Sequence, residues 1–174
     1  MTLQLWSEAF DAGTVIPARF TPDGDNVSPP LRWANVPTRA RELALVLEDL
    51  DAGEPRPLVH WIVWRIPPRL DGLPEAVGGA SEVPPGNGGA ADATSAAATR
   101  EGAEVLEGTN SLDHVGYDGP EPPDDRAHRY RFRLLALDEP LDLGAPPDRE
   151  TLERSVEGHV VEEAQLVGLY ARAQ

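Results

Sequence analysis

Short apolar runs separated by proline-rich turns predict a chain built mainly of β-strands. The clearest run is His128–Leu137, where histidine, tyrosine, phenylalanine and leucine alternate with arginine up to residue 134. Alternation with a period of two is typical of an antiparallel strand with one buried face. The runs Glu42–Asp49 and Leu58–Ile66 are apolar along most of their length, and they predict two more buried strands.

The remaining elements are expected to be shorter. Residues 164–172 have the pattern of a final strand, and residues 3–6 and 32–33 predict brief ones. A helix is expected after a proline pair, where Asp148 can cap the first turn. Side chains then recur at helical spacing at Leu152, Val156 and His159 or Val160, and Gly158 is expected to divide this stretch into two short helices. The predicted fold class is therefore mostly β, with a small helical element before the last strand.

One long stretch, residues 78–107, departs from this pattern. It has no aromatic residue and consists largely of glycine, alanine and small polar residues, so it offers little apolar surface to bury. We interpret it as a surface loop, and a domain linker is the less favoured alternative. Because domains average about 150 residues, the chain is predicted to form a single domain over residues 1–174 that carries this loop as an insertion.

The charge balance excludes several classes of partner. The chain has 15 basic and 30 acidic residues, a formal net charge of −15, and every basic residue is arginine. Nucleic acids and anionic membrane surfaces are bound through basic side chains, so neither is expected as a generic partner. Such a surface is tolerated best where salt screens its self-repulsion, which favours a halophilic source. An acidic protein that simply avoids lysine is the alternative.

The absence of certain residues and segments narrows the choice further. With no cysteine, the chain has no disulfides, thiolate zinc sites or cysteine nucleophiles. The first residues lack the basic and apolar regions of a signal peptide, and no apolar run approaches the length of a membrane span. A cytoplasmic protein without stable membrane insertion is expected.

Acidic, histidine and tyrosine side chains gather at the ends of the best predicted strands. Asp49 and Asp51 close the first strand, His60 lies near the start of the second, and His128 and Tyr130 open the third. Spacing alone does not bring these three pieces together. The simpler interpretation is that the acids are turn residues and the histidines are core residues. Asp25, Asn26 and Ser28 form a similar polar group that we interpret as a structural turn.

Six sequence blocks, in order, resemble the phosphatidylethanolamine-binding protein family, in its bacterial and archaeal branch of Raf-kinase-inhibitor-like proteins. The blocks are SPPLRW (28–33), VLEDLDAGEP (46–55), VHWIVWRIP (59–67), GYDGPEPP (116–123), HRYRFRLLALD (128–138) and EGHVVEEAQLVGLYAR (157–172). The resemblance covers nearly all of the chain except residues 78–107. It implies a compact fold of antiparallel sheets with a few short peripheral helices.

The resemblance also implies one small pocket that binds phosphate-bearing head groups without catalysis or a cofactor. The matching residues are Asp49, Asp51, His60, Gly119, Pro120, His128 and Tyr130. Two imidazoles and a phenol hydroxyl supply donors for a phosphate, and glycine allows close backbone approach. The carboxylates suit such a site if one orients a histidine or accepts a bond from a protonated phosphate oxygen, or if one receives an ammonium group.

Three positions depart from the family pattern. Leu50 and Gly53 stand where the family has prolines, so this turn is expected to be looser. Glu121 stands where the family often has cysteine. A carboxylate there weakens anion binding if it points inward and has no such effect if it faces solvent.

Two other functions remain as alternatives. The first is a protein-interaction module that inhibits a kinase or a protease, with residues 78–107 as a contact arm, although the sequence identifies no protein partner. The second is a metal-dependent hydrolase that uses Asp49, Asp51, His60 and His128 as ligands, since mixed carboxylate and imidazole sites suit zinc or manganese.

Overall fold

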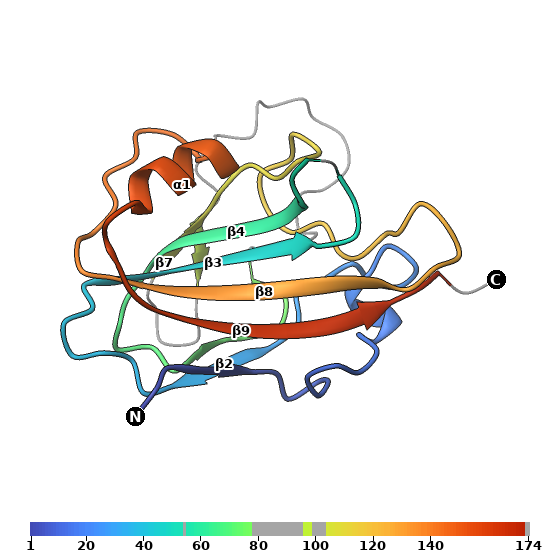
Figure 1. Cartoon of the computed structure of the whole chain (residues 1–174), viewed down its shortest axis with the longest axis horizontal. Coiled ribbons are helices and arrows are strands. Elements are labelled where there is room, and N and C mark those ends of the chain that lie inside the picture. Colours follow the sequence, from blue (N-terminus) through green and yellow to red (C-terminus); the bar gives the residue numbers. More distant parts are fainter. Residues whose placement is uncertain (54, 78–95, 99–103, 173–174) are drawn as a thin grey trace.

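Two antiparallel sheets make up most of the fold. The structure is a computed structural model that describes residues 1–53, 55–77, 96–98 and 104–172 (Figure 1). The larger sheet has the order β6 (Ala96–Ala98), β7 (Glu104–Glu107), β4 (Leu58–Ile66), β3 (Glu42–Asp49), β8 (His128–Leu137) and β9 (Val160–Tyr170). The smaller sheet has the order β1 (Gln4–Trp6), β2 (Leu31–Ala34) and β5 (Gly72–Leu73). The helical elements are the 3-10 turn η1 (Ala18–Phe20) and the helix α1 (Arg149–Val156).

The large sheet is the middle one of three layers, with the small sheet on its inner face and α1 on its outer face (Figure 1). Between the two sheets lies the larger apolar core, which includes Trp33, Trp61 and Phe132. A smaller core under α1 includes Leu152 and Val156 of the helix. The predicted class, mostly β with antiparallel sheets and peripheral helical elements, is confirmed.

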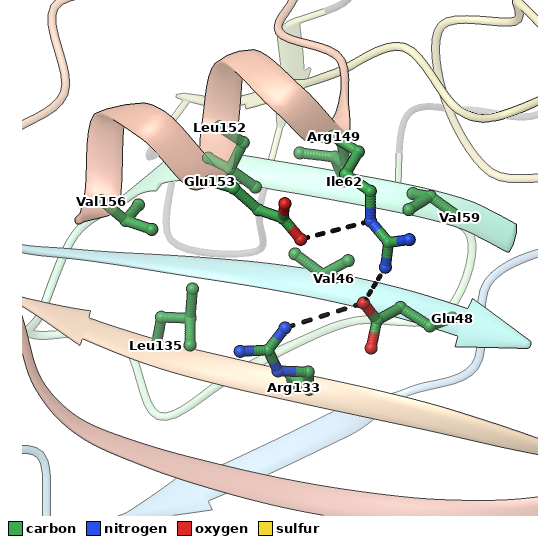
Figure 2. Close-up of a pocket in the computed structure, with 10 residues that line it drawn as sticks. All are labelled: Val46, Glu48, Val59, Ile62, Arg133, Leu135, Arg149, Leu152, Glu153 and Val156. Atoms are coloured by element: carbon green, nitrogen blue, oxygen red, sulfur yellow. Dashed lines mark hydrogen bonds and ion pairs between the residues drawn. The ribbon is translucent and has the colours of Figure 1, made fainter. Parts of the chain in front are cut away.

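The outer face also carries a buried ionic network. The Glu48 side chain, only 2% exposed, accepts a bond from Arg131 at 2.7 Å and one from Arg149 of α1, while Arg133 lies 3.6 Å away. Arg149 also approaches Glu153 at 3.3 Å, so the helix is tied to the sheet by charge as well as by apolar contact (Figure 2). A cavity of about 30 Å³ remains beneath the helix.

The three main strands have the predicted bounds, and their alternation places the side chains as expected. On β8, Tyr130 and Phe132 are fully buried on the inner face, and Arg131 and Arg133 extend along the outer face. The final strand begins at Val160, four residues earlier than expected, and pairs with β8 along its length.

Two local predictions are wrong. Within residues 78–107, predicted as a loop, β6 and β7 are strands, and β7 pairs with β4 through Val63 and Glu107. Val105 of β7 is fully buried in the main core, so tertiary burial overrides a composition that reads as loop. Residues 78–95 and 99–103 lie outside the described residues.

The second error concerns the stretch after Asp148. Asp148 does cap α1, since its carboxylate accepts the Thr151 N–H at 2.8 Å. Gly158 has a left-handed φ of +81° and ends the turn after the helix, but Val160 then enters β9 instead of a second short helix. β-Branched residues favour this extended pairing.

Within the described ranges, no helix is long and apolar enough to cross a membrane.

Candidate functional site

The ends of β3, β4 and β8 bring four of the predicted site residues together. Asp49 and Tyr130 are direct partners in the ladder between β3 and β8. His128 lies two residues before Tyr130 and therefore on the same inner face of the sheet. The His60 and Tyr130 rings meet edge to face with centroids 5.5 Å apart, and the His128 ring stacks on Tyr130 at 6.5 Å.

His60 reaches this cluster because of a β-bulge. In the ladder between β3 and β4, Leu47 pairs with Trp61 and Glu48 pairs with Val59, so His60 has no partner on β3. An extra residue of this kind locally bends a strand and changes the direction of its side chain.

Asp49 and His128 form a buried hydrogen-bonded pair. Asp49 Oδ2 lies 2.8 Å from His128 Nδ1, and both side chains are almost completely buried. The other carboxylate oxygen accepts the Asp51 backbone N–H at 2.9 Å. Since a carboxylate only accepts, Nδ1 of His128 carries the proton, and Nε2 is the nitrogen left for another partner.

A short loop segment sets the orientation of His60. His60 Nδ1 donates to the Asp118 carbonyl oxygen at 2.9 Å. In return, the Asp118 backbone N–H donates to the His60 carbonyl oxygen at 3.1 Å. The next residue, Gly119, donates its N–H to Asn26 Oδ1 at 2.9 Å. Gly119 and Pro120 are both buried, and they come directly after Asp118, the residue that contacts His60.

The Tyr130 hydroxyl is buried and makes no hydrogen bond of standard geometry to the described residues, although it interacts with the Asp49 side chain. Burial raises the pKa of Tyr130, and the nearby negative charge of Asp49 raises it further. The hydroxyl is therefore neutral at physiological pH and available as a donor. A buried hydroxyl that lacks a standard hydrogen bond, on a ring in contact with two imidazoles, is the feature expected of a site that accepts a polar group from outside the chain.

Asp51 makes its hydrogen bonds outside this cluster. Its carboxylate accepts the Arg129 backbone N–H at 2.7 Å and two guanidinium N–H groups at 2.8 and 3.1 Å. These bonds lower the pKa of Asp51 to about 2. The structure places Asp51 as the partner of Arg129, and its role as a ligand-binding residue stays a prediction.

Replacing Asp51 by asparagine is expected to cause a small, pH-dependent loss of stability. The folded-state pKa lies below the ordinary 3.8, so the charged carboxylate stabilises the fold above that value, and this contribution is lost as the pH falls through about 2. Urea unfolding of both proteins at about pH 6 and about pH 3 measures the difference. A difference as large at the lower pH contradicts the assignment.

Sequence reasoning missed the support given by Asp118 and assigned Asn26 only to a turn. The Asp118 carboxylate accepts from Asn110 Nδ2 at 2.6 Å and lies 2.8 Å from Nδ1 of the exposed His114. These bonds hold the backbone that orients His60. Asn26 has a left-handed φ of +55°, as a turn residue does, and the same residue fixes Gly119. The contacts of Asp118 with His60 and of Asn26 with Gly119 leave no signal in the sequence, because each joins distant segments.

The departures from the family pattern have visible outcomes. Glu121 is exposed, and its carboxylate lies 3.5 Å from Arg172, so it faces solvent and not the cluster. Gly53 adopts a left-handed φ of +81°, and the turn closes through a 3.1 Å bond from the Leu58 N–H to the Ala52 carbonyl. Glycine suits that conformation better than the family's proline would.

The described residues contain no group of three or more potential metal ligands close enough to hold an ion. Asp51, one of the four ligands suggested by the hydrolase alternative, is bonded to Arg129 instead.

Sequence comparisons identify relatives along the whole chain. A family model described as phosphatidylethanolamine-binding protein matches residues 6–171. A UPF0098 protein of Methanothermobacter thermautotrophicus is 40% identical over 170 residues, covering 98% of this chain and 99% of that protein. A UPF0098 protein of Pyrococcus abyssi is 34% identical over 170 residues, covering 95% of this chain and 84% of that protein.

Two solved structures are similar to this chain over nearly its whole length. A Chlamydia trachomatis structure, described as a phosphatidylethanolamine-binding protein homologue, superposes with a TM-score of 0.80 at 31% identity and covers 99% of both chains. Escherichia coli YbcL superposes with a TM-score of 0.79 at 21% identity, covering 99% of this chain and 100% of that one. The latter likeness concerns the fold alone.

Proposed function

Because this chain belongs to the phosphatidylethanolamine-binding protein family, a family of binding proteins, we propose that it binds a small phosphorylated or otherwise anionic ligand without catalysing a reaction. The proposed site consists of His60, His128 and Tyr130 as donors, Asp49 behind them, and the backbone of Gly119 and Pro120 at the side. Asp51 is included because of the family resemblance, although its carboxylate pairs with Arg129.

The observation that carries this proposal is the buried hydroxyl of Tyr130, which lacks a standard hydrogen bond to the described residues. A buried donor without a hydrogen bond costs about 1–3 kcal/mol of folding stability. Native proteins therefore keep such a donor mainly where a ligand or a water molecule accepts its hydrogen bond. A ligand oxygen that accepts this O–H removes the penalty on binding.

The two imidazoles are the other proposed donors. Each histidine uses Nδ1 within the protein, on Asp49 or on the Asp118 carbonyl, which leaves Nε2 of each ring for the ligand. An Nε2–H donor requires the doubly protonated ring, since Nδ1 already carries a proton. With that proton in place, Nε2 of His128 donates outward while Nδ1 keeps its bond to Asp49.

The side chains of the cluster support a noncatalytic role. The chain has no cysteine, and each imidazole uses Nδ1 in a bond within the protein. Among the described residues of the cluster, the neutral Tyr130 carries the only hydroxyl. Such an arrangement binds an anion but provides no activated attacking group.

Titration with phosphoethanolamine, followed by NMR of the histidine rings in about 1 M salt, tests the proposal. The chain has four histidines, so each ring can be assigned. The His60 and His128 resonances are expected to shift in a saturable manner. His159 serves as the internal control and should not respond. It pairs with Asp138 at 3.0 Å, at the end of β8 and β9 that is opposite to the cluster. If His60 and His128 remain unchanged at saturating concentrations, the proposed function is wrong.

Replacing Tyr130 by phenylalanine is expected to weaken phosphoethanolamine binding about tenfold or more, because the ring stays and only the donor is lost. Since the hydroxyl makes no standard hydrogen bond to the described residues, the same change should leave stability unchanged or slightly raised. Isothermal titration and urea unfolding give the two quantities. Unchanged affinity would show that the hydroxyl does not contact the ligand.

The cytoplasmic location and high-salt habitat expected from the sequence remain part of this proposal. The net charge of −15 supports the high-salt habitat, and it argues against long-range attraction of an anionic ligand. Recognition then depends on short-range donors inside the cluster.

A further inference from the structure

One carboxylate lies against the open nitrogen of the buried histidine. Asp124 Oδ1 is 3.7 Å from His128 Nε2, the nitrogen that the Asp49 bond leaves free. This distance is too long for a hydrogen bond but short enough for a direct charge interaction. Asp124 therefore stands where the proposed site needs an oxygen of an external anion.

Asp124 is held in this position by its own loop. The Arg126 guanidinium donates to Oδ2 at 2.7 and 3.0 Å, and the Arg126 backbone N–H donates to Oδ1 at 2.9 Å. These bonds lower the pKa of Asp124, so the carboxylate is charged at physiological pH. Two bonds from one guanidinium also fix its orientation. The side chain nevertheless remains 39% exposed, so it can move away without disturbing the core.

Building on the proposed function, we infer that Asp124 determines the specificity of the site by competing with the ligand for His128 Nε2. An incoming anion must displace this carboxylate or share the imidazole with it, and either course costs free energy. Ligands that carry only negative charge are weakened most. A ligand with a positive group next to its anionic one loses less, because the displaced Asp124 can receive that group.

A general effect of negative charge is the main competing explanation. Asp125 provides the comparison, since it is the next residue of the same loop and is exposed. Asparagine at either position removes one negative charge near the same site. Only the change at Asp124 removes the group that lies beside His128.

The experiment compares wild type, Asp124→Asn and Asp125→Asn with two probes, inorganic phosphate and phosphoethanolamine. Affinities are measured by isothermal titration at one fixed pH and salt concentration, and the His128 ring resonances are recorded before and after addition. Asp124→Asn is expected to bind inorganic phosphate about tenfold more tightly than wild type, which corresponds to one close charge interaction at a partly exposed site. Its gain for phosphoethanolamine should be smaller, and Asp125→Asn should change either affinity by less than about twofold.

Each outcome is decisive. Equal gains in the two variants mean that only net charge matters and overturn the inference, as does an Asp124→Asn variant that binds inorganic phosphate like wild type. If none of the three proteins shows a response of His60 and His128 to either probe, the proposed function fails and the inference fails with it. Freed from Asp124, the Arg126 guanidinium could itself attract phosphate. The double variant Asp124→Asn with Arg126→Gln should therefore keep most of the gain, and a complete loss of the gain assigns it to Arg126 and overturns the competition.

Discussion

Replacing Glu48 by glutamine is expected to lower the free energy of unfolding by about 3–5 kcal/mol, the usual cost of breaking a buried ion pair from one side. Glu48 is 2% exposed and neutralises guanidinium groups of Arg131 and Arg149, with Arg133 close by. Without its charge, these partly buried cations lose their common counterion. The link between α1 and the large sheet loosens with them, as Figure 2 indicates for the Arg149 contact.

Urea unfolding in the same salt measures this loss, and Glu150→Gln is the matched control. Glu150 pairs with Arg154 at 2.8 Å, but both side chains are more than 70% exposed. This variant also removes one negative charge, here from an exposed position on α1, and should change the free energy of unfolding by less than about 0.5 kcal/mol. Similar losses in both variants would mean that the network contributes no more than a surface ion pair.

Replacing Gly119 by alanine is expected to damage both the fold and the site. A Cβ there would lie 2.1 Å from the Phe20 carbonyl oxygen and 2.9 Å from Thr21 Cα, which are backbone atoms that cannot rotate away. The loop must shift, at a cost of about 1–3 kcal/mol for overpacking. Because Asp118 precedes this glycine, the shift withdraws the carbonyl that holds His60 Nδ1. Affinity for phosphoethanolamine should fall more than about tenfold.

Gly144→Ala is the control for this change, since no atom lies within 4 Å of the added Cβ. It should leave stability and ligand affinity nearly unchanged. NMR of the His60 ring shows whether the loop has moved in Gly119→Ala before any ligand is added. A variant with wild-type affinity and an unshifted His60 resonance would show that the loop adapts without affecting the site.

The fold could be predicted from the sequence where the periodicity was strong. The alternation of β8 and the apolar runs of β3 and β4 gave their bounds, because burial on the two faces of a sheet imposes a pattern on neighbouring residues. The strand β7 was missed, since only the distant pairing with β4 makes four ordinary residues into a buried strand. The second helix was wrongly predicted because valine spacing after Gly158 fits a helix as well as a strand.

The candidate site was predictable through the family resemblance more than through spacing. Asp49, His60, His128 and Tyr130 do meet, but the bulge that directs His60 and the Arg129 contact that holds Asp51 depend on register and on tertiary neighbours. In the sequence, Asp124 is one of 30 acidic residues and carries no signal of its own. Its distance from His128 turns that general charge into a specific contact.

The adjacent acids Glu48 and Asp49 have a consequence for the fidelity of folding. Strand β3 is buried on both faces, so hydrophobicity alone hardly distinguishes its correct alignment from one displaced by a single residue. Such a displacement would turn Glu48 toward the histidines and Asp49 toward the arginines, with carboxylates of the wrong length for each. The contacts of Glu48 with the arginines and of Asp49 with His128 therefore favour the correct alignment of β3, and the candidate site forms only in the alignment that also joins α1 to the sheet.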